Sequence, residues 1–260
     1  MPIVDVNDLR NQVKDVYQRV AKEPDAEFHF RTGRELAADL GYPPELLDRI
    51  PEDSVRSFAG VGHYFDLLEL REGDRVLDLG SGSGMDTFFA ALRVGPRGEV
   101  VGLDMTDEQL DKAEALRREH GFDNVSFERG YIEELPFEGG RFDAVISNGV
   151  INLSAQKDEV FAEVARVLKP GGTLALADIV TERQLDEDIK CNESLWAACI
   201  GGAAQQDHYR ALMTQAGLAV TVMRDNDAYG FLSKSAQGAS RQFGVKSASL
   251  AARREAGVSA

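Results

Sequence analysis

One glycine-rich stretch constrains the fold of this chain more than any other feature. The apolar run at 76–79 contains an acid, Asp78, and a helical pattern over 85–93 follows closely. Between them lie three glycines at alternate positions: Gly80, Gly82 and Gly84. A strand that ends in a glycine-rich turn and opens a helix lets the backbone approach a ligand closely, and the N–H groups at the helix start face that ligand. We therefore expect a nucleotide-like ligand at this turn.

A second strand-like run supports this interpretation. It spans 100–103 and ends in Asp104, about twenty residues beyond Gly84. In doubly wound sheets, an acid at this point hydrogen-bonds the hydroxyl groups of a ribose. Asp104 is therefore a candidate ribose-binding residue.

Strand-like and helix-like patterns alternate from residue 75 onward, which is typical of a mostly parallel sheet with helices on both faces. We expect strands at 75–79, 99–103, 125–128, 142–147, 173–179, 218–224 and 246–252, and helices at 85–93, 106–120, 156–168 and 205–216. The connection at 225–245 is too short for a full crossover helix with long loops, so an antiparallel last strand is favoured. The predicted fold is α/β: a Rossmann-like, doubly wound, seven-stranded sheet, mostly parallel.

Residues 1–70 are predicted to form an N-terminal helical cap, or lid, on a domain that spans 71–260. Apolar residues three and four apart predict a helix over 5–21, and shorter helices are expected at 45–50 and 61–70. The lid is rich in aromatic residues, which either exclude water around a small acceptor or belong to the core: Tyr17, Phe28, Phe30, Phe58 and Tyr64.

Composition excludes several classes of partner. The net charge is −15, with 44 acidic against 29 basic residues, which argues against nucleic acid and against an anionic membrane surface. No apolar run approaches the roughly 18 residues of a membrane helix, and the first ten residues do not resemble a secretion signal, so we expect a cytoplasmic protein. Two cysteines provide neither a disulfide framework nor a four-ligand zinc site, and we expect no metal.

The spacing of the glycines separates two ligand classes. A nicotinamide-binding turn has the pattern G-x-G-x-x-G, but its third glycine would fall on Met85. The pattern D-x-G-x-G-x-G at 78–84 followed by Asp104 resembles instead the class I S-adenosylmethionine-dependent methyltransferases. Segments at 130–137 (GYIEELPF), 142–148 (FDAVISN) and 166–172 (RVLKPGG) occur in the order found in that class.

This resemblance implies S-adenosyl-L-methionine as the cofactor and a role for each matching residue. The three glycines would face the methionine part, Asp78 its amino group, and Asp104 the ribose. The adenine would contact Met105, Ile132 and Glu133, although Met105 and Ile132 would equally suit the core. Asn148 would face the methionine part or the acceptor.

A narrower resemblance covers nearly the whole chain. The segments 146–154 (ISNGVINLS), 101–106 (VGLDMT), 199–203 (CIGGA) and 243–250 (FGVKSASL) are similar to arsenite methyltransferases. Members that methylate As(III) hold it with three cysteines, and this chain departs from that pattern. Val61 stands where the lid of the family has a cysteine, and Gly149 replaces the cysteine of an Asn-Cys-Val motif.

Two cysteines remain as candidate acceptor-site residues. Cys199 matches an arsenic-binding position of the family, and Cys191 would supply a second thiolate if the intervening loop folds back. Each is alternatively a small buried hydrophobe. His29 and His63 are the candidate polar groups of the lid, with a structural role as their alternative.

Four functions follow from these residues. The first is methyl transfer to a small soft nucleophile, with arsenite as the default of the family, because such an acceptor needs little help from a base. The second is S-methylation of hydrogen sulfide or a small thiol such as methanethiol, which the two missing cysteines favour. The third is C-, O- or N-methylation of a small metabolite, and the fourth is binding of the cofactor without catalysis.

Overall fold

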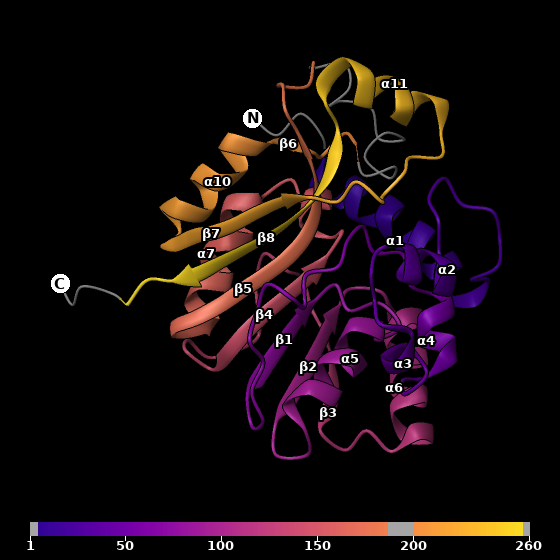
Figure 1. The fold of residues 1–260 in the computed structure, drawn as a ribbon, viewed down its shortest axis with the longest axis vertical. Helices are drawn as coiled ribbons and strands as arrows, with labels where there is room; N and C mark the ends of the chain where they lie inside the picture. Colours follow the sequence, from indigo (N-terminus) through magenta and orange to yellow (C-terminus); the bar gives the residue numbers. More distant parts are fainter. Residues whose placement is uncertain (1–4, 187–199, 257–260) are drawn as a thin grey trace.

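The computed structural model describes residues 5–186 and 200–256 as an α/β fold (Figure 1). Among the described residues, eight strands form one sheet in the order β3-β2-β1-β4-β5-β8-β7, with the short β6 beside β5. The strands are β1 (Arg75–Leu79), β2 (Glu99–Asp104), β3 (Val125–Arg129), β4 (Phe142–Asn148), β5 (Leu168–Thr181), β6 (Ala204–Gln205), β7 (Leu218–Asp225) and β8 (Lys246–Arg254). Strand β8 runs antiparallel to both β5 and β7, while strands β1 to β5 pair in parallel. The predicted fold class and the antiparallel last strand are confirmed, and β6 is an additional strand.

Helices cover both faces of this sheet. They are α1 (Val6–Lys22), α2 (Gly33–Asp39), α3 (Pro44–Leu47), α4 (Glu52–Arg56), α5 (Met85–Val94), α6 (Asp107–His120), the 3-10 turn η1 (Ile151–Leu153), α7 (Lys157–Val167), α10 (Gln206–Gln215) and α11 (Lys234–Phe243). In Figure 1, α7 and α10 lie together, apart from α1 to α6. None of the described helices combines the length and apolar character that crossing a lipid bilayer requires.

Alternation along the strands produces two hydrophobic cores. In β4, Ala144 and Ile146 join the core formed with α5, α6 and the N-terminal region, whereas Val145 joins the core formed with α7 and α10. Successive side chains of a strand point to opposite faces, so a strand buried on both faces is almost continuously apolar. The N-terminal region therefore shares its core with the sheet, and the lid boundary at residue 70 stays a prediction.

The predicted helix at 61–70 is wrong. This segment forms turns without a helix, and Tyr64 and Phe65 are buried in the core. The hydroxyl of Ser247 in β8 donates to the carbonyl oxygen of Val61 (2.6 Å), and that of Ser249 donates to the carbonyl of His63 (3.0 Å). These backbone groups bond to a distant strand, so they take no part in a helix.

The connection at 225–245 also differs from the prediction. It contains the ten-residue helix α11, which Ser233 caps by accepting a hydrogen bond from the N–H of Ala236 (3.1 Å). Gly244, with φ of 66°, ends the helix in the left-handed region. The side-chain cap and the glycine define the start and the end of this short helix. Strands β7 and β8 on either side of it still pair antiparallel.

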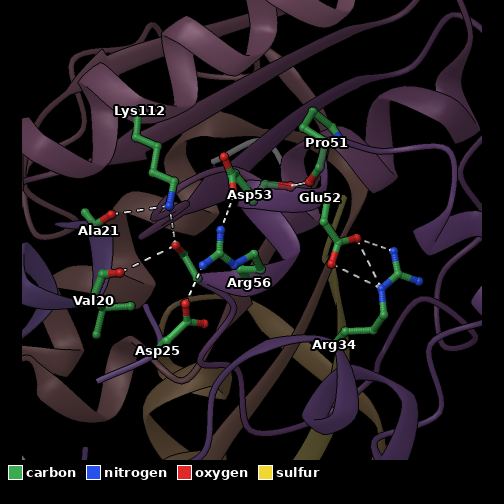
Figure 2. Close-up of polar contacts among 11 residues, drawn as sticks. Val20, Ala21, Asp25, Arg34, Pro51, Glu52, Asp53, Arg56 and Lys112 are labelled. Carbon is green, nitrogen blue, oxygen red and sulfur yellow. Dashed lines mark hydrogen bonds and ion pairs between the residues drawn. The ribbon is translucent and has the colours of Figure 1, made fainter. Parts of the chain in front are cut away.

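Polar contacts attach the N-terminal region to α6 (Figure 2). The ammonium group of Lys112 in α6 donates to the carbonyl oxygen of Ala21 (3.2 Å) and to the hydroxyl of Ser57 (2.7 Å). Arg56 forms ion pairs with Asp53 and with Asp25. The ammonium group thus joins the end of α1 to the segment after α4, and its partial burial lowers the pKa of Lys112.

Substitution of Lys112 by Met tests this attachment. The variant keeps an unbranched side chain one atom shorter than lysine but removes both hydrogen bonds, so we expect the free energy of unfolding to fall by about 1–3 kcal/mol. Urea denaturation measures the change. The matched control is Lys234→Met at the exposed start of α11, which should shift stability by less than about 0.5 kcal/mol. Equal midpoints for the two variants would contradict the assignment.

Candidate functional site

A cleft opens at the carboxyl ends of β1, β2 and β4. These strands meet where the strand order reverses, which is the usual ligand-binding position of an open α/β sheet. Most of the residues predicted to bind the cofactor line this cleft: Asp78, Gly80, Gly82, Asp104, Met105, Ile132, Glu133 and Asn148. Gly84 does not line the cleft; it is the N-cap residue of α5. The structure thus brings the sequence motifs together, and their individual ligand roles stay predictions.

Two physical constraints require glycine in this turn. Gly80, Gly82 and Gly84 have φ of 66°, 53° and 91°, which side chains of L residues rarely adopt. A Cβ at Gly80 would lie 2.5 Å from Cγ2 of Val150, and a Cβ at Gly84 would lie 2.9 Å from the ring of Phe127. Other residues at these two positions would displace the wall of the cleft or the core.

Asp104 braces this turn. One oxygen of its carboxylate accepts a hydrogen bond from the N–H of Gly82 (2.9 Å), and the other accepts from the N–H of Thr106 (2.8 Å). Burial raises the pKa of Asp104, while these backbone hydrogen bonds oppose the shift. Each carboxylate oxygen has a second lone pair, so the group can also accept from ribose hydroxyls.

Helix α1 contributes to the opposite wall. The guanidinium group of Arg10 forms an ion pair with Glu133 (3.1 Å) and lies over the ring of Tyr131, 4.2 Å from its centroid. The other carboxylate oxygen of Glu133 accepts from the hydroxyl of Ser154 (2.6 Å). Glu133 therefore joins three segments of the chain at the side of the cleft where adenine is expected.

Asp86, at the start of α5, is a residue of the cleft that sequence reasoning missed. Its carboxylate accepts hydrogen bonds from the hydroxyls of Tyr42 (2.6 Å) and Tyr64 (2.8 Å) and from the amide of Asn148 (3.0 Å). Nearly every position of α5 is buried, which makes an acid in it exceptional. An acid within a helix that is apolar on all sides is the signal that would have found it.

Asp78 lies close enough to Asp86 for their charges to interact. Its carboxylate accepts a hydrogen bond from the hydroxyl of Thr87 (2.6 Å). Burial, and then the negative charge of Asp86, raise the pKa of Asp78 well above its usual range, and burial also raises the pKa of Asp86. Two buried carboxylates thus share one wall of the cleft.

Asn148 holds the lid as well as lining the cleft. Its side-chain oxygen accepts from the N–H of Val61 (2.8 Å), and its amide group donates to the carbonyl oxygen of Gly62 (3.0 Å) and to Asp86. A Cβ at Gly60 would lie 2.6 Å from the amide nitrogen of Asn148, so the lid approaches closely at this point.

The lid aromatics occupy three kinds of position. Tyr17 and Phe58 line the cleft, whereas Phe28 and Phe30 stack on each other with ring centroids 5.5 Å apart. Tyr64 is fully buried and reaches Asp86.

Neither of the predicted lid histidines is among the described residues that line the cleft. The ring of His63 lies edge-on to Tyr42, with centroids 4.7 Å apart, and burial lowers its pKa. The ring of His29 lies edge-on to Phe30 at 4.7 Å. This geometry favours the structural role that the sequence left open for both residues.

The two positions at which the resemblance predicts missing cysteines, 61 and 149, lie side by side. A Cβ at Gly149 would lie 3.2 Å from Cγ1 of Val61, and Gly149 has φ of 72°. Val61 is buried. The replacement of family cysteines at these positions stays a prediction, and Cys191 and Cys199 lie outside the described residues.

Comparisons with known proteins show the family of this chain. Residues 70–217 match the family model described as a methyltransferase domain. An arsenite methyltransferase from Aquipseudomonas alcaligenes is 45% identical over 66% of this chain and 51% of its own length. One from Halobacterium salinarum is 36% identical over 75% of this chain and 50% of its own length. The chain thus spans about half the length of these curated relatives.

A solved structure is similar over most of both chains. The arsenic(III) S-adenosylmethionine methyltransferase of Chlamydomonas reinhardtii superimposes with a TM-score of 0.65 at 30% identity, over 86% of this chain and 74% of that one. The chain therefore belongs to the S-adenosylmethionine-dependent methyltransferases, in their arsenite methyltransferase-like family. The expected cofactor, S-adenosyl-L-methionine, is confirmed with the family.

The cleft fits this cofactor in charge as well as in shape. Four acidic side chains line it, Asp78, Asp86, Asp104 and Glu133, and S-adenosylmethionine has a positively charged sulfur and an ammonium group. Among the described residues of the lining, Arg10 is the basic one, and it is paired with Glu133. A cationic ligand would therefore relieve the repulsion within the lining.

Substitution of Asp104 by Ala tests the ribose role. Loss of charge-assisted hydrogen bonds should weaken binding of S-adenosylmethionine by roughly 10- to 100-fold, as measured by titration calorimetry. The control is Asp107→Ala, which removes an exposed acid paired with Arg129 at the start of α6 and should leave affinity unchanged. Unchanged affinity in the Asp104 variant would remove its ribose role.

Proposed function

We propose that this protein transfers a methyl group from S-adenosylmethionine to a small soft nucleophile, with arsenite as the first candidate. The observation that carries the proposal is the cleft, which is lined by the glycine turn and by four acidic side chains, Asp104 among them, and would therefore suit a cationic nucleoside. The arsenite methyltransferase relatives support the choice of acceptor.

In this proposal, the residues of the cleft contribute by orienting the two reactants and excluding water. When bound, the cofactor supplies a methyl group on a positively charged sulfur, which a nucleophile attacks in line. Gly82 and Asp104 hold the donor, and Tyr17 and Phe58 exclude water from it. Orientation of the two reactants supplies much of the acceleration in such a displacement. A soft nucleophile needs little help from a base, and within the described lining neither a histidine nor a lysine provides one.

A second acceptor has support from one observation. Val61 and Gly149 lie at neighbouring positions and neither carries a thiol, where the family resemblance leads us to expect two cysteines; this favours S-methylation of hydrogen sulfide or a small thiol. Cys199, with Cys191 as a second thiolate, would be the arsenic-binding residue under the arsenite proposal. Methylation of another small metabolite and cofactor binding without turnover are the remaining alternatives.

Transfer of label from S-adenosylmethionine to a panel of acceptors separates these functions. The panel contains arsenite, sulfide, methanethiol and small metabolites. We expect arsenite to be methylated and Cys199→Ser to lower that rate by at least about 10-fold, equivalent to one lost contact in the transition state. Full activity of Cys199→Ser toward arsenite would contradict the assigned thiol, and label transfer to sulfide alone would favour the second acceptor.

Substitution of Val61 by Cys provides the complementary gain-of-function test. A thiol at this position should raise the rate with arsenite relative to the rate with sulfide. Val55→Cys, a change of another buried lid valine, is the matched control and should leave the ratio unchanged; neither valine is among the described residues that line the cleft. An equal response of both variants would show that position 61 has no special relation to the acceptor. Donor binding without transfer to any acceptor would support the non-catalytic alternative.

A further inference from the structure

The carboxylates of Asp78 and Asp86 form a buried negative site without a matching cation in the described protein. The hydrogen-bond donors to Asp86 are two tyrosine hydroxyls and one amide, and the donors to Asp78 are the hydroxyl and the backbone N–H of Thr87. All of these donors are neutral. Within the described part of the chain, no Lys or Arg forms an ion pair with either acid, and none is among the main causes of its pKa shift.

Burial of these two carboxylates raises the free energy of the folded protein unless a cation lies beside them. A buried charge that lacks an opposite charge has a penalty of several kcal/mol, and two neighbouring acids also repel each other. Asp78 is 2% exposed and Asp86 is 5% exposed, so water cannot solvate them well. Both acids line the cleft, and a positively charged ligand can therefore reach them.

The contacts of Asp86 point to the part of the cleft where the sulfur of the donor would lie. Asp104 and Gly82 lie on the side assigned to the ribose, whereas Asp86 bonds to Tyr42 and Tyr64 of the lid and to Asn148. The lid segment that includes Phe58 and Gly60 lines the cleft at this point. The sulfur connects the ribose to the methionine chain, and its methyl group must face the acceptor beneath the lid.

We infer that Asp86 is a specificity-determining residue that distinguishes the positively charged sulfur of the methyl donor from the neutral sulfur of the demethylated product. In the transfer, the acceptor forms a bond to the methyl carbon, and the electron pair of the broken carbon–sulfur bond stays on sulfur. The sulfur thereby becomes a neutral thioether, and its attraction to Asp86 disappears. This inference rests on the proposed binding of S-adenosylmethionine in the cleft and is independent of which acceptor is used.

Hydrogen bonds keep the negative charge of Asp86 in place. The hydroxyls of Tyr42 and Tyr64 and the amide of Asn148 favour the charged form of the carboxylate, opposing the effect of burial on its pKa. Removal of one hydroxyl should therefore weaken the charge effect without removing the acid. This gives a graded series of variants for one test.

The test is titration calorimetry with three ligands. S-adenosylmethionine is positively charged at sulfur, sinefungin has a protonated amine at the corresponding place, and S-adenosylhomocysteine is neutral there. We expect Asp86→Asn to lower the affinity for the two cations by at least about 10-fold and the affinity for S-adenosylhomocysteine by less than about threefold, since two opposite unit charges a few ångströms apart attract strongly in a buried site and a neutral sulfur has no such attraction. Tyr42→Phe should shift the same ratio in the same direction by a smaller factor.

The outcomes are distinct. Retained affinity for S-adenosylhomocysteine shows that a variant is folded, and Tyr42→Phe carries the test if Asp86→Asn does not fold. Equal losses for all three ligands would overturn the inference, because Asp86 would then only support the cleft or bind the ammonium group that all three share. Unchanged ratios in the folded variants would also overturn it. Failure of the wild-type protein to bind any of the three would instead overturn the proposed function.

Discussion

A buried carboxylate must find hydrogen bonds inside the protein, and the bonds of Asp86 connect the parts of this molecule that form its site. Tyr42 and Tyr64 come from the N-terminal region, Asn148 ends strand β4, and Asp86 itself begins the helix after the glycine turn. Loss of any one donor would leave a buried polar group incompletely satisfied. The position of the lid over the cleft is therefore tied to the start of α5.

The glycine turn depends on a second carboxylate. Asp104 accepts from the N–H of Gly82 and thereby fixes the turn against the end of β2. Its raised pKa and that of Asp86 have the same first cause, burial. Both acids line the same opening, at the carboxyl ends of the strands where the strand order reverses. A cationic nucleoside suits such an opening, and the relatives of this chain use one.

The sequence predicted those features that depend on local pattern, and it failed where distant residues decide. The strands from β1 to β5 followed from apolar runs, and the turn followed from glycine spacing. The helix expected at 61–70 was wrong because the carbonyls of Val61 and His63 bond to serines of β8, more than a hundred residues away in the chain. Asp86 escaped notice because its tyrosine partners are close in space and distant in sequence. The closeness of positions 61 and 149 likewise depends on how the lid folds over β4.

A crystal structure of the complex with S-adenosylhomocysteine tests the central claim most directly. The account predicts that the ligand occupies the cleft, with its ribose hydroxyls on Asp104, its adenine beside Ile132 and Glu133, and its sulfur facing Asp86 beneath the lid. A ribose placed away from Asp104, or a sulfur that faces away from Asp86, would contradict it.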